Sequence, residues 1–89
     1  MRVALIAKDR PGALQIRKDT RDAHLAYIEK TGLVEMAGPL IEDGEMRGSL
    51  VILAVPDLAA AQDWADADPY AAAGLFESVT LTEWKKVIG

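Results

Sequence analysis

The sequence predicts an α+β domain in which one antiparallel sheet is covered on a single face by helices. Short apolar runs typical of strands alternate with longer Ala- and Leu-rich runs typical of helices. Turn-forming Gly, Pro and Asp residues separate these runs. Of the 89 residues, 51% are hydrophobic and 27% are charged, which is typical of one globular domain spanning residues 1–89.

The first two elements are predicted to be a central strand and a long helix. Residues 3–7 are apolar throughout and have charged residues on both sides, which favours a strand in the middle of the sheet. Residues 9–12 then form a turn. Residues 13–30 contain neither Pro nor Gly and are rich in Ala, Leu, Arg, Lys and Glu, so they predict a helix. Gly32 is expected to end it.

Two strands joined by a loose hairpin connection are predicted next. The first covers residues 33–41 and contains Gly38 and Pro39. Because proline cannot donate to a strand ladder, the stretch near Pro39 is expected at an edge or a bulge. Residues 42–48 form the connection, and the apolar run 49–55 predicts a second central strand.

The last third of the chain is predicted to hold a helix, a short helical piece and a final strand. Asp57 is a suitable N-cap for the helix, and Gly74 ends the short piece. The predicted ranges are 58–65 for the helix, 66–69 for a turn, 70–73 for the short piece and 75–87 for the strand. The order βαββαβ has one usual compact solution, the ferredoxin-like plait, with both helices on one face of an antiparallel sheet.

Composition and charge exclude several classes of function. The net charge of −4 argues against nucleic acid as a partner, because phosphate binding needs a basic face. No apolar run approaches the roughly 20 residues that cross a bilayer. The N-terminal run is too short for a secretory signal, so we expect a cytoplasmic protein without membrane contact. The absence of Cys excludes disulfides, thiolate catalysis and Cys-ligated metal sites.

A homodimer is expected to form through the uncovered face of the sheet. The central strands are apolar at successive positions, so both faces of the sheet carry apolar side chains. A large apolar face is unfavourable in water, and packing two such faces together removes it.

The only histidine, His24, is the first candidate for chemistry, because imidazole titrates near neutral pH. At about 100° per residue, Arg17, Arg21 and His24 fall inside or beside the apolar stripe of the first helix. Burying these groups unpaired is unfavourable, which favours a polar pocket between helix and sheet. The arginines are candidate ligands for a small anion. Structural roles are the alternative, because arginine stems can lie along apolar surface and a boundary histidine can simply bond a carbonyl.

Asp68 is the second candidate. Followed by Pro69, it suits the N-cap of a short helix, which is its purely structural explanation. In the predicted fold this turn lies beside the helix of His24, so the carboxylate could hold one imidazole tautomer and raise the basicity of the other nitrogen. The rest of the site could come from the Ser49 hydroxyl, the Tyr70 phenol and the backbone at Gly38.

Five segments together resemble the YciI-like, or YCII-related, family over nearly the full length and in the same order. They are RDAHL (21–25), AGPL (37–40), GSLVI (48–52), AQDWADADPY (61–70) and WKKV (84–87). The resemblance implies a dimeric ferredoxin-like α/β barrel with a proposed His and Asp active pair. By position these are His24 and Asp68, with Ser49 and the segment of Gly38 and Pro39 nearby. The resemblance also implies acid/base chemistry on small organic molecules, including eliminations in aromatic breakdown.

Two functions from different classes fit these residues. The first is a cofactor-free lyase or isomerase for a small anionic or aromatic-derived compound, in which His24 moves the proton, Asp68 orients it, and Arg17 or Arg21 holds a carboxylate or enolate. The second is a non-catalytic module that binds a small ligand or a partner through the same pocket. A cofactor-free oxygenase is a further alternative. A metal-dependent enzyme is disfavoured, because one His and no Cys leave only carboxylates as further ligands.

Overall fold

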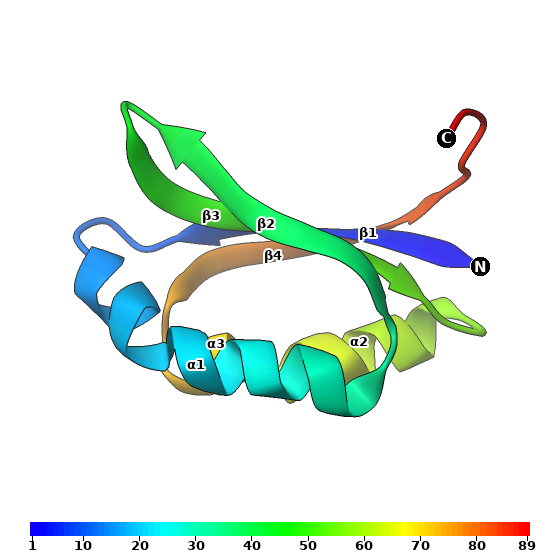
Figure 1. Cartoon of the computed structure of the whole chain (residues 1–89), viewed down its shortest axis with the longest axis horizontal. Coiled ribbons are helices and arrows are strands. Elements are labelled where there is room, and N and C mark those ends of the chain that lie inside the picture. Colours follow the sequence, from blue (N-terminus) through cyan, green and yellow to red (C-terminus); the bar gives the residue numbers. More distant parts are fainter.

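The computed structural model describes residues Met1–Gly89 and confirms the predicted α+β class. The strands are β1 (Arg2–Asp9), β2 (Val34–Glu42), β3 (Glu45–Ala54) and β4 (Phe76–Trp84), and the helices are α1 (Leu14–Thr31), α2 (Leu58–Asp66) and α3 (Pro69–Ala72). The strands form one antiparallel sheet in the order β2-β3-β1-β4. All three helices lie on one side of this sheet and the other side is open (Figure 1).

The core lies between the helices and the two central strands. Side chains alternate along β1, so that Val3 and Leu5 face the helices and are buried. On β3, Val51 and Leu53 point the same way, and Trp64 of α2 packs against this cluster. Both strands have a neighbour on each side, which is why their sequences are apolar enough to predict central positions.

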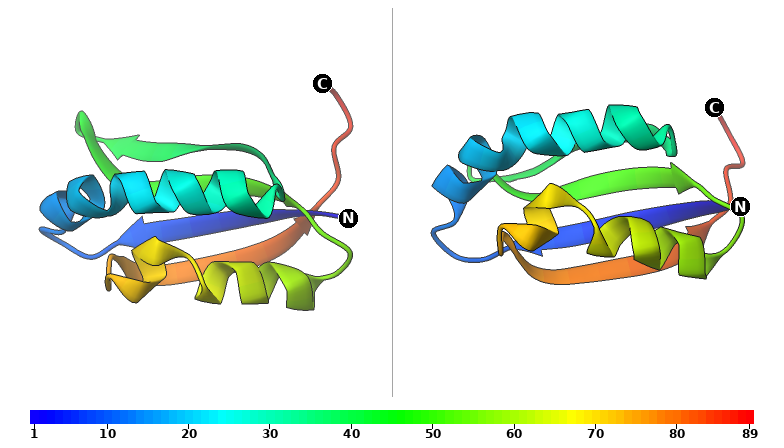
Figure 2. Two further views of the ribbon diagram at one scale, coloured as in Figure 1. Left: turned by 60° about the horizontal axis from the view of Figure 1, so that its bottom comes forward. Right: turned by 90° about the horizontal axis from the view of Figure 1, so that it is seen from below.

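Helix ends agree with the residues predicted to form them. Gly32 follows α1 in the left-handed conformation with φ 65°, and its N–H donates to the Ile28 carbonyl. The Asp57 side chain accepts from the Ala60 N–H at the start of α2. Helices α1 and α2 run side by side along the sheet (Figure 2). None of the three helices has the length and apolar content needed to cross a membrane.

Strand β2 is an edge of the sheet, which is one of the two positions that the proline within it predicts. It pairs only with β3, and its register shifts near both ends, between Val34 and Met36 and between Leu40 and Ile41. Pro39 lies opposite Ser49 of β3. The missing proline N–H therefore removes no bond from the interior of the sheet.

The hairpin between β2 and β3 differs from the predicted loose connection. Strand β2 runs to Glu42 and β3 begins at Glu45, so only Asp43 and Gly44 form the turn. Their φ values are 50° and 76°. Two positive φ values give a turn whose twist matches antiparallel strands, and an Asp-Gly pair favours it. The charged residues on either side of this turn, Glu42, Glu45 and Arg47, occupy exposed strand positions, and the Asp-Gly pair is the signal for a tight hairpin.

The final strand is shorter than the predicted range of 75–87. It ends at Trp84 because Trp84 already pairs with Arg2, the first residue of β1, and no strand lies beyond to pair with later residues. Leu75 is buried just before the strand, where its N–H donates to the Tyr70 carbonyl. The first residue of β1 thus sets where β4 ends.

Gly48 marks a close approach between β3 and β1. A Cβ at this position would overlap the carbonyl oxygen of Ala7. We expect Gly48→Ala to lower the free energy of unfolding by about 1–3 kcal/mol, because the backbone of the central strand pair must shift. Gly38→Ala is the matched control, since a Cβ there meets no atom within 4 Å. Urea denaturation measures both, and equal stability of the two variants would contradict the assignment.

Candidate active site

Helix α1 places three predicted site residues on the side that faces the sheet. Arg17, Arg21 and His24 follow one another at spacings of four and three residues, which is one face of a helix. Arg17 and His24 are buried, with 3% and 6% of their surface exposed, although both are polar. Arg21 is exposed and lines the same cavity. The polar side chains on this face do form a pocket between helix and sheet.

His24 and Asp68 form the buried pair that the sequence predicts. The ring Nδ1 of His24 lies 2.8 Å from Oδ1 of Asp68, which is only 2% exposed. The same oxygen accepts the Tyr70 N–H at 3.0 Å, so Asp68 also caps α3, with Pro69 at the first helical position. One carboxylate therefore performs the capping role and the ring-orienting role, which the sequence left as alternatives.

The pairing with Asp68 leaves the second ring nitrogen of His24 available. Ionised Asp68 can only accept, so Nδ1 donates to it and the neutral ring carries its lone pair at Nε2. Nε2 has no hydrogen-bond partner within the chain. Every side-chain N or O atom that is sealed from solvent has a hydrogen-bond partner. Because Nε2 has none, it is not sealed, and it faces the cavity that His24 lines.

Tyr70 packs against both His24 and Arg17. The rings of His24 and Tyr70 are stacked, with centroids 3.9 Å apart and an interplanar angle of 18°. The guanidinium of Arg17 lies 4.9 Å from the centroid of the Tyr70 ring. Burial raises the pKa of the Tyr70 phenol, and this effect outweighs the positive charge of Arg17. Tyr70 therefore remains a neutral hydroxyl at physiological pH.

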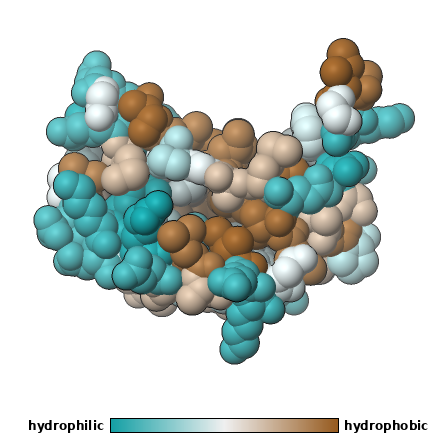
Figure 3. All heavy atoms as spheres, viewed as in Figure 1, coloured by the Kyte–Doolittle hydropathy of each residue, from teal (hydrophilic) through white to brown (hydrophobic).

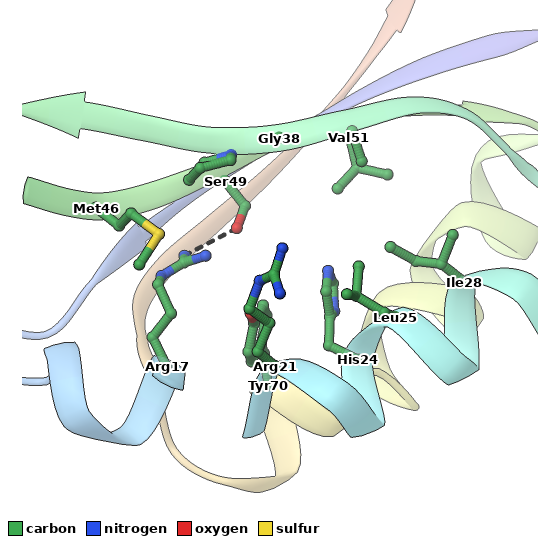
Figure 4. Close-up of a pocket in the computed structure, with 12 residues that line it drawn as sticks. Arg17, Arg21, His24, Leu25, Ile28, Gly38, Met46, Ser49, Val51 and Tyr70 are labelled. Carbon is green, nitrogen blue, oxygen red and sulfur yellow. Dashed lines mark hydrogen bonds between the residues drawn. The ribbon is translucent and has the colours of Figure 1, made fainter. Parts of the chain in front are cut away.

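Arg17 is bound to the sheet by a buried salt bridge. Its Nε and Nη2 donate to the two carboxylate oxygens of Asp9 at 2.7 and 2.8 Å. Nη2 also donates to Oγ of Ser49 at 2.9 Å (Figure 4). Burial alone would lower the pKa of Arg17, but the hydrogen bonds and charge of Asp9 reverse the direction and raise it. Arg17 therefore stays charged in its buried position.

A cavity of about 170 Å³ lies between α1 and the strands β2 and β3. Seven of the eight predicted site residues line it, and Asp68 is the exception because it lies behind His24. Leu25, Ile28 and Val51 form an apolar part of the wall (Figure 4). Hydrophobic residues gather beside the second half of α1, and hydrophilic residues surround its first half (Figure 3). The cavity thus has one polar end and one apolar end.

Gly38 and Pro39 line the cavity in different ways. Pro39 lies opposite Ser49 and shares its direction toward the helices. Gly38 lies opposite Leu50, so a side chain there would point to the open face of the sheet. The backbone of Gly38, rather than the space left by its missing side chain, forms part of the cavity wall.

Asp9 belongs to the polar network of the site through its salt bridge with Arg17, but the sequence predicts only a turn there. It follows Ala7 by two positions, and residues two apart on a strand share a face. That alternation placed its carboxylate on the face covered by α1, which carries Arg17. Leu25 of α1 is 44% exposed and borders the cavity. No three His, Cys, Asp or Glu side chains lie close enough together to hold a metal ion.

The fold and the site define a class of protein, a small plait with a buried His and Asp pair beside a partly apolar cavity. The sequence profile of the YCII-related domain family matches residues 1–85, and the chain belongs to this family. The YciI protein of Escherichia coli strain CFT073 is 38% identical, over 98% of this chain and 99% of that protein.

Solved structures share the fold of this chain. The chain is similar to the 5-chloro-2-hydroxyhydroquinone dehydrochlorinase TftG of Burkholderia phenoliruptrix AC1100, solved in complex with 2,5-dihydroxybenzoquinone. The TM-score is 0.86 and the identity 34%, over 96% of this chain and 94% of TftG. MhuD shares the fold alone, with a TM-score of 0.54 and 23% identity over 100% of this chain and 97% of MhuD. These structural neighbours are dimeric α/β-barrel proteins.

The tautomer of His24 can be measured directly, because the chain has one imidazole. We expect the neutral ring to carry its proton on Nδ1, since Asp68 can only accept. Asp68→Asn should weaken this preference and leave stability within about 1 kcal/mol, because Asn caps a helix about as well as Asp. Ring ¹⁵N chemical shifts report the tautomer. A proton found on Nε2 in the unmodified protein would contradict the assignment.

Proposed function

We propose that the chain is a cofactor-free acid/base enzyme of the lyase or isomerase type, acting on a small anionic or aromatic-derived organic compound. His24 is the proton-transfer group and Asp68 the residue that positions it. The observation that carries this proposal is the unpartnered Nε2 of a buried histidine whose Nδ1 is held by a buried carboxylate. This arrangement suits a general base.

The geometry supports a simple proton transfer. In an isomerisation, Nε2 removes a proton from a carbon beside a carbonyl and the imidazolium returns it to another carbon of the enolate. In an elimination, the electrons of the broken C–H bond form a double bond and the leaving group departs with its electron pair. The proton on Nε2 is then released to solvent. In both reactions Asp68 stabilises the imidazolium that forms.

Two further groups support chemistry on a compound bearing oxygen. The neutral Tyr70 hydroxyl can donate a hydrogen bond to an oxygen on which negative charge develops. The guanidinium of Arg21 adds positive charge at the cavity. Similarity to a dehydrochlorinase over nearly the full chain supports an elimination on an aromatic-derived compound as the first reaction to test.

Substitution of His24 tests this function. We expect His24→Ala to lower turnover by about 10²- to 10⁴-fold, the usual contribution of a general base. The substrate panel should contain halogenated phenols, hydroxyhydroquinones and ring-cleavage lactones. Lys18→Gln is the matched control, because Lys18 is exposed on the same helix and does not line the cavity. Circular dichroism checks that each variant is folded.

Two outcomes would overturn the catalytic proposal. Full turnover in a folded His24→Ala protein would show that the ring does not move the proton. Tight ligand binding by the unmodified protein with no turnover across the panel would favour the non-catalytic binding module.

We also propose that the open sheet face pairs with a second copy of this chain. Ile6 and Leu50 lie on this face and are 45% and 38% exposed, and Met36 beside them is 57% exposed. Exposed apolar side chains gathered on one sheet face are typical of an interface. The structural neighbours have the dimeric α/β-barrel type of fold, which supports a second copy of this chain as the occupant.

Charge placed on the open face should separate such a dimer. We expect Leu50→Glu to shift the protein from dimer to monomer, because two carboxylates would be buried without partners. Leu58→Glu is the matched control, since Leu58 is similarly exposed, at 45%, but lies on α2 on the opposite side of the sheet. Sedimentation velocity measures the mass of each. An unmodified protein that is monomeric at micromolar concentration would contradict the proposal.

A further inference from the structure

We propose that Arg21, and not Arg17, binds the substrate through an anionic oxygen, and that the substrate is a monoanion built on a single six-membered ring. This inference rests on the proposed function of the same cavity. It adds two points to that function. The first is which of the two arginines anchors the substrate, a choice that the sequence leaves open, and the second is the substrate class.

Arg17 is unavailable as an anchor, because its charge is already neutralised. Its side chain and that of Asp9 are 3% and 5% exposed and form a two-point salt bridge. A third donor hydrogen is used by Ser49. Turning the guanidinium toward a ligand would leave the Asp9 carboxylate buried without a partner, which is strongly unfavourable. Arg17 is therefore a positioning residue for Ser49 and the Tyr70 ring.

Arg21 has the opposite properties. It makes no salt bridge or side-chain hydrogen bond within the chain, and it lines the cavity. Its positive charge acts on Tyr70 in the same cavity. It lowers the pKa of the phenol, although burial raises that pKa by more. Residues three apart on a helix have Cβ atoms about 5–6 Å apart, so an oxygen held by Arg21 brings the attached ring close to Nε2 of His24. Both side chains extend from α1 into the cavity (Figure 4).

The charges around the cavity set the charge of the ligand. Arg17 and Asp9 cancel, and Asp68 is screened from the cavity because it lies behind His24 and bonds the Tyr70 N–H. Arg21 then contributes one uncompensated positive charge. One negative charge on the ligand balances it, whereas a second would be desolvated without a partner.

The size and walls of the cavity set the shape of the ligand. An apolar cavity of about 150 Å³ holds one benzene molecule. The present cavity, of about 170 Å³, therefore fits one six-membered ring with small substituents. Leu25, Ile28 and Val51 supply the apolar wall that a flat ring would contact. A fused bicyclic ring is larger than the benzene ring that a cavity of this size holds, so we expect it to fit less well.

The test compares three probes by isothermal titration calorimetry: benzoate, its neutral isostere benzamide, and 2-naphthoate. We expect the unmodified protein to bind benzoate at least 10-fold more tightly than either of the others. Arg21→Gln should weaken benzoate binding about 10- to 100-fold, the strength of a hydrogen bond to a charged group, and leave benzamide unchanged. Arg21→Lys should retain part of the preference, and Lys18→Gln all of it.

The results distinguish this inference from the proposed function. Equal binding of benzoate and benzamide, or an unchanged preference in Arg21→Gln, would overturn the inference even if His24→Ala abolishes turnover. Conversely, the loss of preference in Arg21→Gln would support it even if no substrate is turned over. Arg17→Lys is the second variant. A folded Arg17→Lys protein that loses the preference for benzoate while Arg21→Gln keeps it would assign the anchor to Arg17.

Discussion

The Asp68 carboxylate joins the helical layer to the chemistry of the site. A single oxygen accepts the Tyr70 N–H, which starts α3, and faces Nδ1 of His24 on α1. Helix caps contribute about 1 kcal/mol and hydrogen bonds to charged groups about 1.5–3 kcal/mol, but a buried carboxylate left without partners is more unfavourable than either gain. The position of α3 against α1 and the orientation of the imidazole are therefore fixed by one group.

The salt bridge of Arg17 and Asp9 has the corresponding role between the helix and the sheet. It lets a polar side chain of α1 be buried over β1 and β3 without leaving an unpaired charge. Every side-chain N or O atom that is sealed from solvent has a hydrogen-bond partner, so the polar end of the cavity is stable as a preorganised structure. The groups left available are Nε2 of His24, the Tyr70 hydroxyl and Arg21. A small domain can present such groups only because the neighbouring polar atoms are already satisfied.

Much of the fold followed from local patterns. Apolar runs identified β1 and β3 as central strands, Pro39 identified β2 as an edge, and Asp57 marked the start of α2. The sequence predicts the wrong strand end where the length of a strand depends on the strand that pairs with it. The end of β4 at Trp84 is set by the start of β1, which no pattern within β4 records. The β2–β3 hairpin differs in kind, because its sequence contains the Asp-Gly signal for a tight turn while the surrounding charged residues favour a loop.

The sequence by itself determined the order of elements, the N-cap role of Asp68 and the helical face shared by Arg17, Arg21 and His24. Each of these depends on interactions within a few residues, which periodicity and capping record. Only the tertiary structure decided that His24 meets a carboxylate 44 residues away, that Asp9 neutralises Arg17, and that Arg21 is left free. These outcomes depend on how α1 packs on α3 and on the sheet, because side chains compete for the same buried partners only after the layers are assembled.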